Sequence, residues 1–508
     1  MQMRRLALML FCMLPMAALM YGCGSSNKEG SGTPATVSKV DEATCATCHA
    51  TGKSKTTGDV IYNDYTASAH FTVPGGARAH YPNGVGCQGC HGGGSQHQGV
   101  GPLPYADPSA SGQCFACHKN YLDSKHYAVY PAPAGTSYNY TGAAHNAQYV
   151  SANYQNDCTA CHDPHKADKG ITQEHHDWAA SAHGNVAGEA WAHYDFKLGA
   201  DCIACHTSTG FINYVNSGFT VPTTTWASPT DGTHEVLTCK ACHTDYNFKN
   251  RIRSVGAVKA YKFTYNGQSI TFPNVGSSNL CVTCHSGRGN TQSAKSTRFQ
   301  GHHAPAAGTL FSSSAHTGYE FATKSYGNAT SFIHDKIGTA AVPNTGTSGP
   351  CVTCHMASSN SHKFSAATKN SAGAITGLPT QAVCLKCHSA AFVTPANMEV
   401  LRLGYNETGE LLKAYVANTI KNYLNVAITS ANYNTVADNA YGAFQNAMLT
   451  SEEAGAFTHN SIYAKRLLFD SIDWMDNGAF NNTITIPAGY PNARAWFGAN
   501  ASGVATRP

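Results

Sequence analysis

Nine copies of the motif Cys-x-x-Cys-His dominate this chain of 508 residues and use 18 of its 20 cysteines. The paired cysteines are Cys45 and Cys48, Cys87 and Cys90, Cys114 and Cys117, Cys158 and Cys161, Cys202 and Cys205, Cys239 and Cys242, Cys281 and Cys284, Cys351 and Cys354, and Cys384 and Cys387. The histidines that follow them are His49, His91, His118, His162, His206, His243, His285, His355 and His388. This spacing is the attachment signature of haem c, in which two thiols form thioethers with the vinyl groups on one porphyrin edge. The next imidazole then binds the iron from the proximal side. The sequence therefore predicts nine covalently bound haem c groups.

Structural zinc and disulfide bonds are two other common uses of paired cysteines. A zinc site needs four ligands and gives no reason for a histidine directly after every pair. A disulfide within a Cys-x-x-Cys pair closes very little chain and so stabilises little. Nine repeats that all keep the histidine favour haem over both alternatives.

The supply of side chains indicates the second axial ligand of each iron. After residue 22 the chain has only four methionines, at positions 356, 398, 448 and 475, which are too few for nine irons. Of the 26 histidines, nine belong to the motifs and 17 remain. Bis-histidine ligation, with comparatively low reduction potentials, is therefore expected at most or all sites. A six-coordinate iron has no open position for a substrate, which favours electron transfer over catalysis.

Distal ligands are expected among histidines that lie between or beside the motifs. His70, His183 and His316 each follow two small residues and an alanine, which lets the backbone approach a flat macrocycle closely. The nine predicted distal ligands are His70, His97, His126, His145, His183, His234, His303, His334 and His362. His80, His165, His193, His316 and His459 are reserve candidates, and His175, His176 and His302 rank below them.

The segments between the motifs are rich in Gly, Ser, Thr, Asn and Pro, and they cannot build an ordinary apolar core. We therefore predict a multihaem cytochrome c fold, with mostly irregular loops and short helices wrapped around a haem stack. Each motif is expected on a short helical turn. Residues 255–272 alternate apolar and polar side chains around Asn266-Gly267, which predicts one small β-hairpin with a type I′ turn.

The character of the sequence changes after about residue 395, where cysteines end and His459 is the only remaining histidine. Apolar periodicity predicts helices over residues 401–427, 438–449 and 461–475, the last ended by Asn477-Gly478. Thr450-Ser-Glu-Glu453 is expected to form a capping box. These elements predict an α-helical cap on one end of the haem stack.

Residues 1–22 have the features of a secretory signal peptide. Arg4 and Arg5 precede an apolar run, Leu6 to Met20, that is too short to span a bilayer. The run leads to Gly22-Cys23, which resembles a bacterial lipobox, so Cys23 is the predicted lipidation site; simple cleavage without lipid is the alternative. The predicted organisation is a signal peptide (1–22), a lipidated N-terminus with a flexible linker (23–42), a nine-haem electron-transfer domain (43–395) and a helical haem-free region (396–508).

Several phrases around the motifs resemble the outer-surface multihaem cytochromes of metal-reducing bacteria. They include Cys90-His91-Gly-Gly-Gly-Ser-Gln-His97, Trp178-Ala-Ala-Ser-Ala-His183 and Gly349-Pro-Cys351-Val-Thr-Cys354-His355-Met356. The resemblance implies electron export from the periplasm to Fe(III) or Mn(IV) oxides, electrodes or partner cytochromes. Gly24 stands where an aspartate often signals inner-membrane retention, so we expect an exported outer-membrane lipoprotein, on the cell surface or the periplasmic face. Such a protein would work with other multihaem cytochromes or a porin–cytochrome conduit; self-assembly is left open.

An enzyme is the main alternative class. Some multihaem proteins reduce nitrite or tetrathionate, or oxidise hydroxylamine, at one five-coordinate haem, and the nitrite reductase type commonly replaces one proximal histidine by lysine. All nine motifs here keep the histidine, so we expect an electron conduit without catalytic residues, and a hidden catalytic haem is left open. The formal net charge of +4, without a run of Lys or Arg, predicts no nucleic-acid partner.

Overall fold

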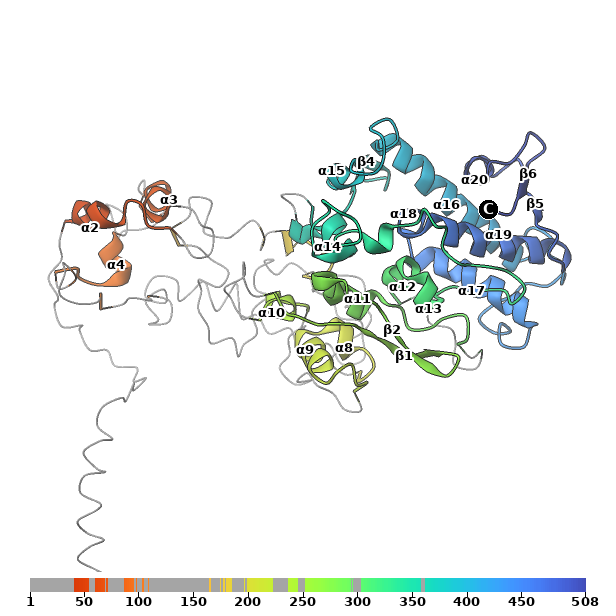
Figure 1. Ribbon diagram of the computed structural model, residues 1–508, viewed down its shortest axis with the longest axis horizontal. Helices are drawn as coiled ribbons and strands as arrows, with labels where there is room; N and C mark the ends of the chain where they lie inside the picture. The colour runs from red at the N-terminus through yellow and green to blue at the C-terminus, as the bar shows by residue number, and fades with distance from the viewer. Residues whose placement is uncertain are drawn as a thin grey trace, which may run out of the picture.

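Figure 1 shows the computed structural model of the chain. It describes residues 41–53, 60–68, 70–71, 86–95, 97, 103–104, 108, 164–165, 174, 177–178, 180–184, 196, 199–222, 236–244, 252–293, 295, 303–357 and 361–508. The predicted signal peptide, Cys23 and the motifs that start at Cys114 and Cys158 lie outside these residues. Eight distal candidates also lie outside them: His80, His126, His145, His175, His176, His193, His234 and His302. Within the described part, no helix combines the length and the apolar character needed to cross a membrane.

Seven of the motifs lie in the described residues, and each overlaps a short helix. These helices are α2 (Glu42–His49), α4 (Cys87–His91), α8 (Ile203–His206), α10 (Cys239–Cys242), α11 (Asn279–His285), α14 (Gly349–His355) and α15 (Gln381–Cys384). A helical turn brings residues i and i+3 to one face, so the two thiols of a motif lie on the same side. The predicted helical turn is therefore confirmed for these seven motifs.

The other elements before residue 395 are also short. They are α3 (Ile61–Ala67), α9 (Ser208–Asn216), η5 (Gly276–Ser278), α12 (Ala306–Leu310), α13 (Ser312–Ala315), η7 (His334–Lys336), η8 (Ser361–Lys363), β3 (Thr368–Lys369) and β4 (Ile375–Gly377). Close backbone packing joins some of them to motif helices. A Cβ at Gly210 of α9 would lie 2.1 Å from the carbonyl oxygen of Ile203 in α8, so only glycine fits there.

The predicted β-hairpin is confirmed, but the expectation of only one is wrong, because β3 and β4 form a second antiparallel pair in the described residues. Strands β1 (Lys259–Tyr265) and β2 (Gln268–Thr271) pair antiparallel. Asn266 and Gly267 between them have φ values of 51° and 73°, and a type I′ turn requires positive φ at both positions. Phe272 and Val282 belong to one buried apolar cluster, so the hairpin packs against motif helix α11.

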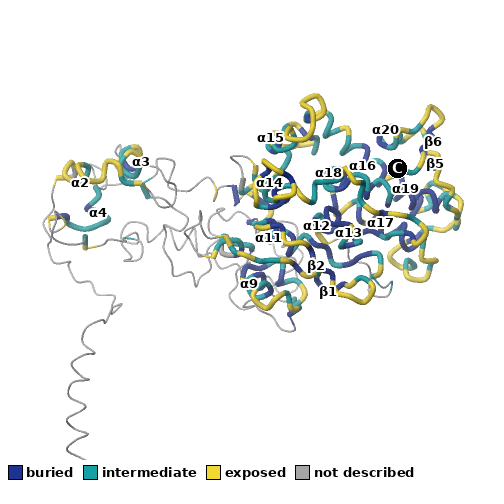
Figure 2. Tube along the Cα trace, in the orientation of Figure 1, coloured by how far each residue is buried: buried dark blue, intermediate teal, exposed yellow. Residues whose placement is uncertain are grey.

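A larger apolar core lies among the C-terminal helices, whose interior is mostly buried (Figure 2). The elements there are α16 (Pro395–Val416), α17 (Asp438–Glu452), α18 (Ala456–His459), α19 (Ser461–Asn477), α20 (Pro491–Phe497), and the antiparallel strands β5 (Thr483–Thr485) and β6 (Val504–Thr506). The helical character predicted for this region is confirmed. Helix α19 ends as expected, at Gly478, which has a φ of 78°.

The bounds predicted for the first C-terminal helix were wrong. Helix α16 starts at Pro395 because the side chain of Thr394 accepts a hydrogen bond from the amide of Asn397 (3.1 Å), and proline fits the first helical turn. The helix ends at Val416, eleven residues before the predicted end, and Asn418 takes a left-handed φ of 54°. The apolar residues that follow it therefore lie in a loop.

The predicted capping box at Thr450 to Glu453 was also wrong. Thr450 lies in the last turn of α17, where its hydroxyl donates to the carbonyl of Ala447 (2.7 Å). The residue that caps α19 is Asn460, whose side chain accepts from the amide of Tyr463. A Thr-x-x-Glu pattern signals a helix start only where the threonine is outside the helix.

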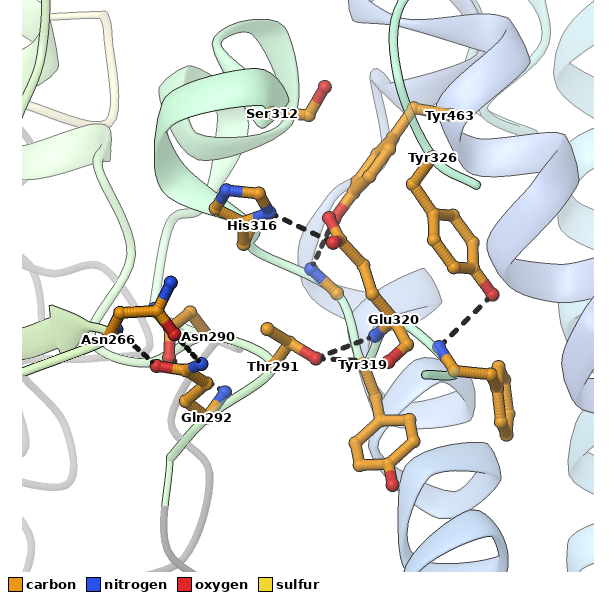
Figure 3. A network of polar contacts seen from close by, with 12 residues as sticks. Asn266, Asn290, Thr291, Gln292, Ser312, His316, Tyr319, Glu320, Tyr326 and Tyr463 are labelled. Atoms are coloured by element: carbon orange, nitrogen blue, oxygen red, sulfur yellow. Dashed lines mark hydrogen bonds and ion pairs between the residues drawn. The ribbon is translucent and has the colours of Figure 1, made fainter. Parts of the chain in front are cut away.

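Buried polar contacts join the C-terminal helices to the segment 303–357. The hydroxyl of Tyr326 donates to Asp470 of α19 (2.7 Å), and the amide of Tyr319 donates to Asn446 of α17 (2.8 Å). Tyr463 of α19 and His316 both meet the carboxylate of Glu320, as Figure 3 shows. These contacts cross the predicted boundary at residue 395.

Candidate haem-iron centres

Histidine pairs are the recurring feature of the candidate site. Six motif histidines each lie close to one histidine from outside the motifs. The pairs and the distances between their ring centres are His49–His97 (6.1 Å), His91–His165 (6.4 Å), His243–His362 (6.4 Å), His285–His183 (6.2 Å), His355–His459 (6.1 Å) and His388–His334 (6.1 Å). No pair joins two motif histidines, so each combines one proximal candidate with one distal candidate.

These distances fit a haem iron held between two imidazoles. An imidazole nitrogen lies roughly 1.1 Å from the centre of its ring and binds a first-row metal at about 2.0 Å. Two imidazoles on opposite sides of one iron would therefore have ring centres about 6.2 Å apart. The angles between the ring planes range from 6° to 87°. Such a range of angles is compatible with a haem iron between two imidazoles, because each ring can turn about its own iron–nitrogen bond.

Four of the nine predicted distal ligands face a motif histidine: His97, His183, His334 and His362. Two reserve candidates, His165 and His459, do so as well. His165 follows His162 by three residues, yet its ring faces His91, which lies 74 residues earlier. No local sequence signal separates these two from the other reserves.

Three further candidates are described in other surroundings. Nδ1 of His70 lies 2.8 Å from the carbonyl oxygen of Pro164, and His303 is exposed. His316 shares the Ser-Ala-His sequence of His183, but its ring stacks on Tyr265, with 3.8 Å between ring centres. Its Nδ1 lies 2.9 Å from Glu320. The small-residue pattern alone therefore does not bring a histidine next to a motif.

Hydrogen bonds at Nδ1 orient several of the paired rings. Nδ1 of His355 lies 3.0 Å from the carbonyl oxygen of Phe364, and Nδ1 of His334 lies 2.7 Å from that of Thr458. Nδ1 of His459 lies 2.6 Å from Glu453. Because Nδ1 is engaged, Nε2 is the nitrogen left to bind a metal, the usual arrangement for a ligating histidine.

Against the effect of burial, Glu453 raises the pKa of His459; at other paired rings, burial favours the neutral state, which is the one that binds iron. Burial lowers the pKa of His285 to about 4, with neighbouring histidines adding to the effect, and it lowers the pKa of His183 and of His355. Burial, assisted by Arg288, also lowers the pKa of motif histidine His206 to about 4. Phe196 packs flat against that ring, with 3.9 Å between ring centres.

Neighbouring motifs also meet through their cysteines. The thiol of Cys284 lies 3.9 Å from the carbonyl oxygen of Cys205, and the thiols of Cys281 and Cys351 hydrogen-bond to each other. Burial raises the pKa of Cys242 to about 12 and that of Cys354 to about 11. The attachment points of the motifs at 202, 281 and 351 are therefore in contact.

Comparison with known proteins points to the same cofactor. The chain is similar to two relatives from Geobacter sulfurreducens, described as the C-type polyheme cytochromes OmcB and OmcC. Each is 27% identical, and the alignments cover 92% of this chain and 94% of the relative. The alignments, of 718 and 737 positions, exceed the 508 residues of this chain, so both relatives contain segments that it lacks. No protein-family model and no solved structure matches the chain. The predicted resemblance to multihaem c-type cytochromes is confirmed.

Proposed function

Since the chain resembles polyheme c-type cytochromes over nearly its whole length, we propose that it carries nine haem c groups and works as an electron conduit rather than as an enzyme. The observation that carries this proposal is the set of six histidine pairs with ring centres 6.1–6.4 Å apart. Each pair supplies one motif ligand and one ligand from a distant part of the chain. A haem bound in this way accepts and returns one electron without an open position for a substrate.

In this function the polypeptide would hold the haem groups, orient the ligand rings and shield the iron ligands from water. The paired cysteines fix each group covalently, and the hydrogen bonds at Nδ1 fix the ring orientation of the ligands. Burial of rings such as His285 excludes water from the iron ligands. Contact between cysteines of different motifs, as at Cys205 and Cys284, keeps these attachment points close together.

We further propose an exported lipoprotein of the outer membrane, anchored through Cys23. Its acceptors would be extracellular metal oxides, electrodes or other multihaem cytochromes, directly or through a porin–cytochrome conduit. The support is the leader sequence, the polar linker after it and the family resemblance. The variant Cys23→Ala should move from the membrane fraction to the soluble fraction, and identical fractionation of wild type and variant would contradict the anchor.

Haem content and spin state test the central proposal together. Mass spectrometry of the mature protein, produced with working cytochrome maturation, should find nine covalent haem additions. Electron paramagnetic resonance of the oxidised protein should show low-spin signals at most or all sites. Seven or fewer additions would contradict the haem count. A strong high-spin signal in the wild type would instead favour the enzyme alternative, because it reports an open iron.

A further inference from the structure

His459 differs from two other paired histidines in the group that meets its Nδ1. Backbone carbonyls, which are neutral, meet Nδ1 of His355 and of His334. A side-chain carboxylate meets His459, with 2.6 Å between Nδ1 and Oε1 of Glu453. Glu453 is only 2% exposed. A negative charge is therefore held inside the protein, directly behind a candidate iron ligand.

The local backbone fixes both side chains. Glu453 is the C-cap residue that directly follows α17, and its amide donates to the carbonyl of Leu449 (3.0 Å). His459 is the last residue of α18, and its amide donates to the carbonyl of Gly455 (2.9 Å). A Cβ at Gly455 would lie 2.6 Å from Cε1 of His459 and 2.9 Å from its Nδ1. The ring thus fits between a glycine and a carboxylate and faces His355.

We propose that Glu453 is a positioning residue that lowers the reduction potential of the haem held by Cys351, Cys354 and His355. The proposal rests on the proposed function, because it requires His459 to be an iron ligand. A carboxylate that accepts a hydrogen bond from Nδ1–H makes the imidazole a stronger electron donor to the metal. The ferric bis-histidine centre also carries one more positive charge than the ferrous centre. A buried negative charge therefore stabilises the oxidised form.

The decisive variant is Glu453→Gln in the full-length holoprotein. Glutamine keeps the size and the hydrogen-bond acceptor but removes the charge. A redox titration followed by electron paramagnetic resonance should show one low-spin haem with a higher midpoint potential and altered g values. Glu453→Asp retains the charge, and its potential should return toward that of the wild type. This second variant also keeps the test valid if the glutamine variant folds poorly.

The matched control is Glu320→Gln. Glu320 accepts a hydrogen bond from His316 in the same way (2.9 Å; Figure 3). The ring of His316, however, stacks on Tyr265 instead of facing a motif histidine. Removal of this charge should leave the midpoint potentials nearly unchanged. An equal shift in both variants would overturn the specific role of Glu453, because it would show a general effect of buried charge.

The variant His459→Ala separates this inference from the proposed function. It should convert one haem from low spin to high spin. If it does so while Glu453→Gln shifts no potential, the role of Glu453 is wrong and the ligation of that haem stands. If His459→Ala leaves every haem low-spin, ligation by His459 is wrong and the inference falls with it.

Discussion

At the scale of single residues, a histidine in this chain takes its role from its surroundings rather than from its neighbours in sequence. His183 and His316 both follow Ser-Ala, yet the ring of His183 faces His285 and the ring of His316 stacks on Tyr265. Burial lowers the pKa of His183, so a neutral ring is available to a metal. The two residues therefore form a natural test pair.

The variant His183→Ala should open one iron without loss of haem, because the thioethers and the proximal His285 remain. We expect a new high-spin signal equivalent to one haem, a new carbon-monoxide-binding site after reduction, and a higher potential for that haem. Electron paramagnetic resonance and carbon-monoxide difference spectra would measure these changes. The control variant His316→Ala should change none of them. Spectra of His183→Ala that equal the wild type would remove His183 from the ligands.

At the scale of elements, the end of α19 carries a destabilising charge. Asp476 lies in the last turn of the helix, where a negative charge opposes the helix dipole. Its Oδ1 is buried without a hydrogen-bond partner. Burial, with a smaller contribution from Asp473, raises the pKa of Asp476 to about 6. The folded state therefore holds this proton more tightly than the unfolded state does.

The sign of the pH effect follows from that difference. As pH rises from about 4 to about 6, the unfolded state releases the proton before the folded state does, so the carboxyl group lowers the stability of the fold. Above about pH 6 the ionised Asp476 exerts its full destabilising effect on the fold. The variant Asp476→Asn should therefore be more stable at pH 7 by about 1 kcal/mol, after allowance for solvent screening, and should lose the advantage below about pH 4.

Thermal unfolding of the holoprotein at pH 4 and pH 7 would measure this effect. The control variant is Asp438→Asn at the start of α17, where the side chain is 82% exposed and pairs with Lys295. It should gain no stability at either pH, because its charge lies at the favourable end of a helix. An Asp476→Asn variant with the same gain at both pH values would contradict the proposed cause.

The elements also show how far the sequence alone could lead. The motif helices and the hairpin were predictable because their signals are local, such as Cys-x-x-Cys spacing and Asn266-Gly267. The end of α16 was not, because apolar residues continue after Val416 and the break depends on the left-handed Asn418. The partners of His285 and His355 were not predictable either, since His183 and His459 lie about 100 residues away and only folding brings them close.

At the scale of the whole molecule, the proposed cofactors would reverse the sign of the charge. If the signal peptide is removed as proposed, Arg4 and Arg5 are lost and the chain has a formal charge of +2. Nine haems would add 18 propionates, or roughly −18 at neutral pH, and each ferric centre would return about +1. The holoprotein should therefore be negative in both redox states. It should migrate toward the anode in native electrophoresis at pH 7, and migration toward the cathode would contradict the haem count or the ionisation of the propionates.

The order of the paired histidines along the chain also determines the order in which the six candidate iron sites can be completed. His183 and His334 precede their partners His285 and His388 in the chain, so both rings are present as soon as the motif has been synthesised. In the other four pairs the distal candidate comes later, by 104 residues for His355 and His459. Maturation that proceeds from the N-terminus would therefore leave the haem beside α14 open until α17 and α18 have formed. A chain cut short before residue 459 would carry that haem with one face exposed to solvent.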